Sequence, residues 1–152
     1  MGVKVTRMGA VGLVAASALL LLLLLPAGVA FAQGKVAFHM MVSHVSQTPG
    51  PIDPRGEALH AVLKREIRYE SLKVLDTQIL ALHLNDIGTV KLPTGRRVRV
   101  RPMDLGEDGV LVAVEIEGST QADLRVPNRR IVVIGGQPYQ GGRLVISLEP
   151  RY

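Results

Sequence analysis

The stretch Arg96–Glu117 constrains the fold more than any other, because apolar and charged residues alternate with period two on both sides of a turn. The turn sequence is Gly106-Glu107-Asp108-Gly109, which is typical of an antiparallel hairpin. The alternation places six apolar side chains on one face: Val98, Val100, Val110, Val112, Val114 and Ile116. The pattern therefore predicts a hairpin with one buried face and one solvated face.

The first 32 residues have the three parts of a secretory signal peptide. Lys4 and Arg7 precede an apolar run from Met8 to Leu25, and the small-residue triplet Ala30-Phe31-Ala32 supplies a cleavage site. The sequence thus predicts a signal peptide over residues 1–32, a single β-rich domain over 33–152, and a periplasmic or secreted protein. The alternative is an uncleaved anchor, because residues 8–25 are long enough to span the inner membrane.

Composition narrows the class of protein. The chain has no cysteine, which excludes disulfides and thiolate metal sites and favours a bacterial periplasm or exterior over a eukaryotic secreted domain. Its net charge is +5, with no tryptophan, three tyrosines and two phenylalanines. Nucleic-acid and sugar surfaces use clustered aromatic rings, so we expect neither kind of ligand.

The remaining chain reads as one strand, one helix and then further strands. Lys35–Val45 is apolar on both faces, as in a central strand of a covered sheet. Asp53 and Pro54 then form a helix start, followed by apolar residues at helical spacing to about Tyr69. In the following segment, Ser71–Leu84, polar residues interrupt the apolar row, which suggests a bulge.

The C-terminal third continues the β pattern. A short strand is expected at Thr120–Val126, and a final pair at Arg130–Ile134 and Arg143–Leu148, joined by the glycine-rich segment Gly135–Gly142. We therefore predict an α+β fold: a mostly antiparallel sheet, as a sandwich or half-barrel, with one amphipathic helix packed on it and an apolar signal helix ahead of it.

This order of features resembles a group of small exported bacterial β-rich proteins without an assigned function. The matching pieces are the apolar strand before Ile52-Asp53-Pro54-Arg55, the helix ending near Tyr69-Glu70-Ser71, the turn Leu92-Pro93-Thr94-Gly95, and the closing segment Gly135–Leu144. The resemblance spans nearly all of residues 33–152. It implies export and one β-rich domain with a single helix, and it implies no activity.

Histidine and methionine residues suggest one alternative, a periplasmic copper or zinc site. The candidate ligands are His39, Met41, His60 and His83. On a strand His39 and Met41 share a face, so His60 and His83 would have to approach from elsewhere in the fold. Methionines in an apolar strand more often fill gaps in a core, and that interpretation is favoured.

Motifs for catalysis are missing. The chain has neither a G-x-S-x-G elbow nor an H-E-x-x-H helix. The Gly135–Gly142 segment leads into a strand without a following lysine, so a flexible hairpin loop is favoured over a phosphate cradle. Glu115 and Glu117 lie side by side instead of flanking a substrate. We predict a non-enzymatic protein without a cofactor, unless a site forms only in three dimensions.

An arginine row is the most distinctive feature that remains. It consists of Arg97, Arg99 and Arg101, with Arg129 and Arg130 further along the chain. The row suggests a stripe for an envelope protein or an anionic surface. The competing interpretation, which is favoured, pairs it with Glu115 and Glu117 across the hairpin. The sequence thus predicts an exported module whose sheet surface or edge docks on an envelope or extracellular component.

Overall fold

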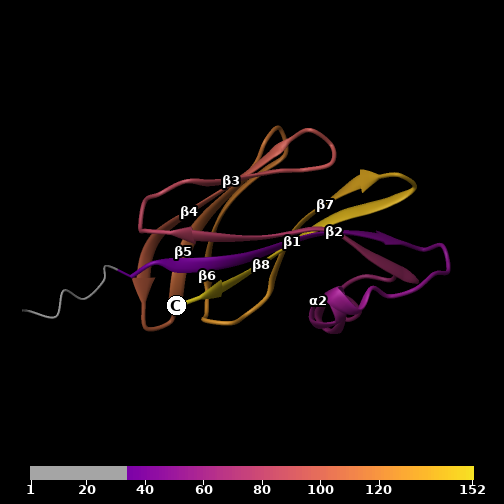
Figure 1. Cartoon of the computed structure of the whole chain (residues 1–152), viewed down its shortest axis with the longest axis horizontal. Coiled ribbons are helices and arrows are strands. Elements are labelled where there is room, and N and C mark those ends of the chain that lie inside the picture. Colours follow the sequence, from indigo (N-terminus) through magenta and orange to yellow (C-terminus); the bar gives the residue numbers. More distant parts are fainter. Residues whose placement is uncertain (1–33) are drawn as a thin grey trace, which may run out of the picture. The chain divides into compact units, whose positions relative to one another are not determined.

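Residues 34–152 are the part of the chain that the computed structural model describes. They form one compact unit of two four-stranded antiparallel sheets and one short helix (Figure 1). The expected signal peptide and its helix, residues 1–32, lie outside this part of the chain. No helix within residues 34–152 is long and apolar enough to cross a membrane.

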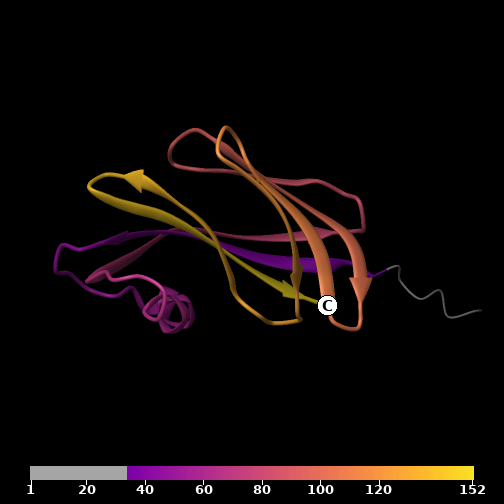
Figure 2. The same cartoon turned by 180° about the vertical axis from the view of Figure 1, so that it is seen from behind.

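The first sheet takes strands from both ends of the described chain, and the second is formed by the four consecutive strands between them. The first sheet has the order β2-β1-β8-β7, with β1 (Val36–Ser46), β2 (Ser71–Leu82), β7 (Val132–Tyr139) and β8 (Gly142–Arg151). The second has the order β3-β4-β5-β6, with β3 (Gly88–Lys91), β4 (Arg97–Gly106), β5 (Gly109–Ile116) and β6 (Thr120–Val126). The connections β2–β3 and β6–β7 carry the chain between the sheets (Figures 1 and 2). The predicted mostly antiparallel fold is confirmed.

The β4–β5 hairpin supplies one wall of the core between the sheets, as its alternation predicts. Val98, Val100, Val112 and Val114 are at most 1% exposed. They pack against inward-facing residues of the first sheet, which include Phe38, Met40, Ile146 and Leu148. Val100 lies opposite Val114 and Arg99 opposite Glu115, so the register is one of those the sequence allowed. This shared core makes the two sheets a sandwich.

A second core lies on the other face of the first sheet. Its buried members are Val45, Leu59, Leu63, Leu72, Val74 and Val145. Two of them come from α2 (Glu57–Leu63), which lies beside the ends of β1 and β2 (Figures 1 and 2). The central strand β1 is therefore covered on both faces, which explains why its sequence is apolar on both and confirms the prediction for Lys35–Val45.

The helix begins where the sequence predicts and ends earlier. The Asp53 carboxylate accepts from the Arg55 amide at 3.0 Å and caps the 3₁₀ turn η2 (Pro54–Gly56) that leads into α2. The predicted extension to Tyr69 is wrong. The amides of Glu66 and Ile67 both donate to the Leu63 carbonyl, which closes the helix. Three consecutive charged residues, Lys64–Glu66, offer no apolar side chain to carry the buried stripe further.

The glycine-rich segment of the last hairpin is mostly strand, so the prediction of a flexible loop at Gly135–Gly142 is wrong. Pairing continues from Val132 to Tyr139, which lies opposite Gly142. Only Gln140 and Gly141 form the turn, with φ of 44° and 74°. Gly135, with φ of 72°, is the extra residue where the register shifts. The glycines therefore provide a bulge and a tight turn.

The predicted bulge in the second strand is confirmed. Val42 lies opposite Asp76 and Ser43 opposite Val74, which leaves Leu75 as the extra residue of β2. The bulge bends β2 where the face covered by α2 ends. It lets one long strand serve both the sandwich core and the second core.

Candidate binding groove

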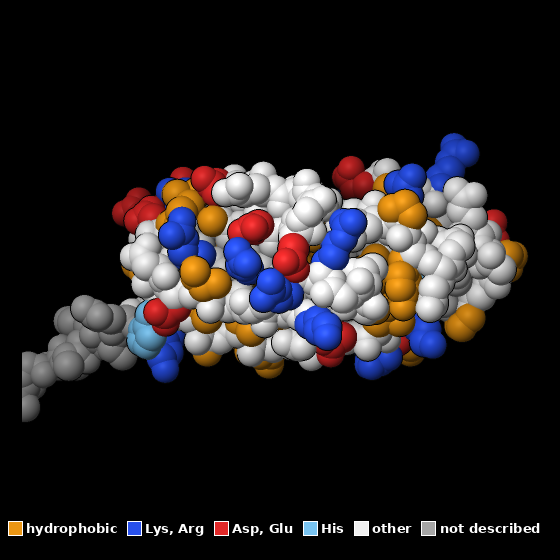
Figure 3. All heavy atoms as spheres, turned by 90° about the horizontal axis from the view of Figure 1, so that it is seen from above, with side chains coloured by type: hydrophobic (Ala, Val, Ile, Leu, Met, Phe, Trp, Pro, Cys, Tyr) orange, Lys and Arg blue, Asp and Glu red, His pale blue; other side chains and the backbone are white. Residues whose placement is uncertain are grey.

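Two arginines of the row, Arg97 and Arg99, are neutralised within their own sheet. Arg97 pairs with Glu117 at 3.1 Å and Arg99 with Glu115 at 3.3 Å, all of them on exposed side chains. Hydrogen bonding from Arg97 lowers the pKa of Glu117. Figure 3 likewise shows Lys and Arg side chains interspersed with Asp and Glu on one face of the molecule. The pairing interpretation therefore holds for these two arginines.

The other three predicted arginines do not extend the row into a stripe. Arg101 lies opposite Ala113, and among residues 34–152 it forms no ion pair. Arg129 and Arg130 belong to the connection between β6 and β7, where the Arg129 amide donates to the Pro150 carbonyl. They lie after the end of β6 and off the strand that carries Arg101. The structure thus leaves one unpaired arginine on the face of the second sheet.

The four predicted metal ligands are not brought together. His39 and Met41 share a face of β1, as predicted, and line a hollow of 220 Å³ beside α2. Ile79 lies opposite His39, so His83, past the end of β2, is about 13 Å further along the strand direction. His60 lies on α2 and bonds to Tyr69. Within residues 34–152 no three His, Cys, Asp or Glu side chains converge on one point.

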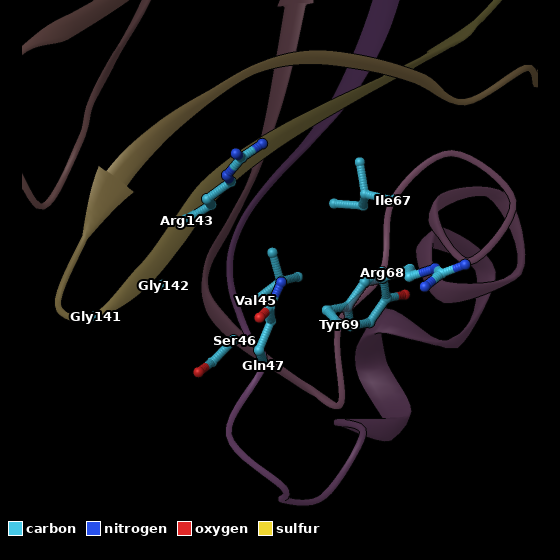
Figure 4. Close-up of a pocket in the computed structure, with 9 residues that line it drawn as sticks. All are labelled: Val45, Ser46, Gln47, Ile67, Arg68, Tyr69, Gly141, Gly142 and Arg143. Carbon is cyan, nitrogen blue, oxygen red and sulfur yellow. The ribbon is translucent and has the colours of Figure 1, made fainter.

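A larger hollow lies at the far end of the first sheet, between the β7–β8 hairpin and the segment that follows α2 (Figure 4). Its volume is 400 Å³. Its lining residues are Val45, Ser46, Gln47, Ile67, Arg68, Tyr69, Gly141, Gly142 and Arg143. In Figure 4 Arg143 extends from β8 toward the side of Ile67, whereas the guanidinium of Arg68 points away from Arg143.

A second hollow, of 520 Å³, lies beside the first, between α2 and β7. Its lining residues are Val62, Leu63, Glu66, Ile67, Val133, Gly135, Gly136, Arg143 and Val145. Ile67 and Arg143 line both hollows, which are therefore adjacent, and we call the two together the α2 groove. Its combined size falls within the range of ligand sites in proteins.

A missing side chain opens the floor of the α2 groove. Gly136 lies opposite Val145, whose side chain faces α2. A Cβ atom placed on Gly136 would meet only Arg143 Cδ, at 4.0 Å, and the φ of Gly136 is not in the left-handed region. The local backbone therefore tolerates a side chain at this position. The hollow between α2 and β7 has room at this position because the sequence places no side chain there.

Tyr69 forms a rigid wall of the same groove. Its hydroxyl and Nδ1 of His60 share a hydrogen bond of 2.6 Å, and the two rings meet edge to face with centroids 5.6 Å apart. Partial burial raises the pKa of the Tyr69 hydroxyl above its ordinary value, so the group stays protonated at neutral pH. The histidine proposed as a metal ligand instead holds an aromatic ring in place.

The lining of the α2 groove combines apolar side chains, glycine backbone and three charged side chains. Its described lining contains one carboxylate, Glu66, and no histidine. Apolar side chains alternate with exposed glycine backbone, and Arg143 lies at the junction of the two hollows. Such a lining offers shape, apolar contact and the positive charges of Arg68 and Arg143 to a ligand.

The fold places the chain in the class of β-sandwiches with one helix on an outer face. No family model, curated protein or solved structure matches the chain. The resemblance to small exported bacterial proteins therefore stays a prediction.

Sequence patterns did not reveal the groove residues. Gly136 belongs to a segment that the sequence predicts to be a loop, and Arg143 does not belong to any row of charged residues. The one available signal was the cluster of four glycines around Gln137–Gln140, since glycine in a strand often marks a bulge or a close approach by a ligand.

Proposed function

We propose that this protein is an exported, non-enzymatic binding module that holds a segment of a partner protein of the envelope or exterior in the α2 groove. The observation that carries the proposal is that two open hollows lie side by side and share Ile67 and Arg143. Two adjacent, open hollows accommodate a length of chain better than a single enclosed molecule.

The groove walls support this function because they are preorganised. The second core fixes α2 on the sheet through Leu59 and Leu63, each 1% exposed. The β7–β8 hairpin is held by a two-residue turn instead of a mobile loop. A rigid groove loses little conformational entropy on binding, which favours affinity.

Crosslinking in living cells tests the proposal. A photoreactive phenylalanine analogue replaces half-buried Val62 in the groove, and a matched control replaces exposed Gln121 on the second sheet. We expect a discrete protein adduct from the Val62 position and none from the Gln121 position. Equal adducts from both positions, or none from Val62, would contradict the proposal.

Export is the second part of the proposal, and it is tested separately. N-terminal sequencing of protein recovered from the periplasm or medium should begin at Gln33, as cleavage after Ala32 requires. A start at Met1 in the membrane fraction would support the anchored alternative through residues 8–25. A start at Met1 in the cytosol would contradict export.

A further inference from the structure

We infer that the segment held in the α2 groove is an extended acidic peptide, whose carboxylate binds Arg143 and whose apolar side chains enter the space above Gly136. This inference rests on the proposed function and names the chemistry of its ligand. The argument uses the position of Arg143, the open floor beside it, and the edge of β7.

Arg143 has a positive charge that the described chain does not neutralise. None of the ion pairs within residues 34–152 includes it, and its side chain is exposed. It lines both hollows, so a ligand that fills either one contacts it. A guanidinium in this position provides a two-pronged donor for a carboxylate, which is the geometry that arginine favours.

Glu66 and Arg68 limit where the ligand's negative charge lies. Glu66 lines the hollow between α2 and β7, so it repels an acidic group placed against the helix. The guanidinium of Arg68 points away from Arg143 in Figure 4 and does not share the same ligand atoms. The carboxylate therefore lies on the hairpin side of the groove, against Arg143.

Apolar contact supplies the rest of the binding surface. Val133 and Val145 flank the gap above Gly136, and Val62 and Ile67 face it from the opposite wall. A side chain of the size of valine or leucine fits the gap that the missing Cβ leaves. Burying an aliphatic side chain of this size contributes more to affinity than one exposed ion pair.

The ligand does not add a strand to β7. Strand addition needs a regular free edge with its amide groups available. β7 has its bulge at Gly135 and a proline at position 138, which lacks an amide hydrogen. Both features are typical of edges that resist pairing. The peptide therefore binds in extended form through its side chains, across the face of the hairpin.

A displayed library of random seven-residue peptides tests the inference on the full chain. We expect peptides retained by the wild-type protein to be enriched in Asp or Glu next to valine, isoleucine or leucine. Arg143→Gln should lower affinity for a retained peptide about tenfold and remove the acidic preference, and Arg143→Lys should keep part of it. Arg101→Gln, a matched loss of an unpaired charge on the second sheet, should leave both the affinity and the acidic preference unchanged.

A second pair of variants separates the apolar contribution. Gly136→Val fills the groove floor and should abolish retention of all peptides, while Ala113→Val, on the second sheet, should leave retention intact. Thermal unfolding of each variant shows that the fold persists. Retention of basic peptides, an acidic preference that survives Arg143→Gln, or binding that survives Gly136→Val would overturn the inference.

The two proposals fail in different ways. A protein adduct at Val62 together with no acidic preference in the library leaves the proposed function standing and overturns the ligand chemistry. An adduct whose added mass is below that of a peptide overturns both, because the groove then holds a small molecule.

Discussion

The hydroxyl of Tyr69 and Nδ1 of His60 lie 2.6 Å apart, which ties the segment after α2 back to the helix itself. The two residues are nine positions apart in sequence, and the helix ends between them. Hydrogen bonds from the Ile67 amide to the Leu63 carbonyl and from the Glu70 amide to the Ser46 carbonyl hold the same segment. Together with them, the Tyr69–His60 bond shapes one wall of the α2 groove.

Removing this hydrogen bond should loosen the wall without unfolding the domain. We expect Tyr69→Phe to lower the free energy of unfolding by about 0.5–1.5 kcal/mol, the usual net contribution of one hydrogen bond. His60→Ala should cost a similar amount, and the double variant less than the sum of the two. Denaturant titration of the three variants measures this coupling, and strict additivity would contradict it.

Acid should weaken the start of the helix through Asp53. Hydrogen bonds from the Arg55 side chain and amide lower the pKa of Asp53 from 3.8 to about 2. Because the folded-state pKa is depressed, the stabilisation is present above the unfolded pKa and is lost as pH falls from about 4 to about 2. Asp53→Asn should therefore be less stable than wild type near neutral pH, and the gap should close below about pH 2. A urea midpoint difference that stays constant with pH would contradict this.

Introducing threonine should cost much more stability on the buried face of the β4–β5 hairpin than on its solvated face. Val112 is fully buried, so Val112→Thr places a hydroxyl in the core and should cost about 1–3 kcal/mol. Arg101→Thr, on the solvated face, should change stability by no more than about 0.5 kcal/mol. Thermal unfolding of the two variants compares their losses of stability. Equal losses would mean that the alternation does not define the core.

Much of the fold could be predicted because alternation and capping are local signals. The period-two pattern around Gly106–Gly109 predicts the hairpin and leaves only the even registers open, and the Asp53–Pro54 pair predicts the helix start. The helix end could not be predicted from spacing, because Ile67 continues the apolar spacing of the helix, whereas its amide and that of Glu66 both bond to the Leu63 carbonyl. The same holds for β7, whose strand pairing overrides the low strand propensity of its glycines.

The candidate site was harder to predict than the fold. The α2 groove forms from residues near 45, 67, 136 and 143, which only the sheet order β2-β1-β8-β7 brings together. Arg97 and Arg99, which the charge pattern of the sequence marks as candidate binding residues, have acidic partners in the structure. Charge rows are visible in a sequence, whereas a hollow left by a missing side chain is not.

The free edge of β2 is protected along part of its length. Leu72 bonds to the backbone at Pro51 and Asp53, and the Val74 amide donates to the Asp53 carboxylate. Further along, no backbone partner from residues 34–152 covers the edge at Ile79, whose side chain is 62% exposed. An open edge with an exposed apolar residue favours association.

Replacing Ile79 should therefore change association and not stability. We expect Ile79→Lys to reduce self-association at high protein concentration while the unfolding free energy stays within about 0.5 kcal/mol of wild type. Sedimentation velocity over a concentration series measures the first quantity. Association that is equal in the two proteins would show that this edge is not the cause.

The most direct test of the central claim combines the crosslinker at Val62 with Gly136→Val in the same full-length chain. The added side chain fills the groove floor where the backbone leaves room for it. If a partner segment lies in the α2 groove, the protein adduct should disappear while the thermal unfolding curve stays in place. An adduct that persists at the same yield would contradict the account.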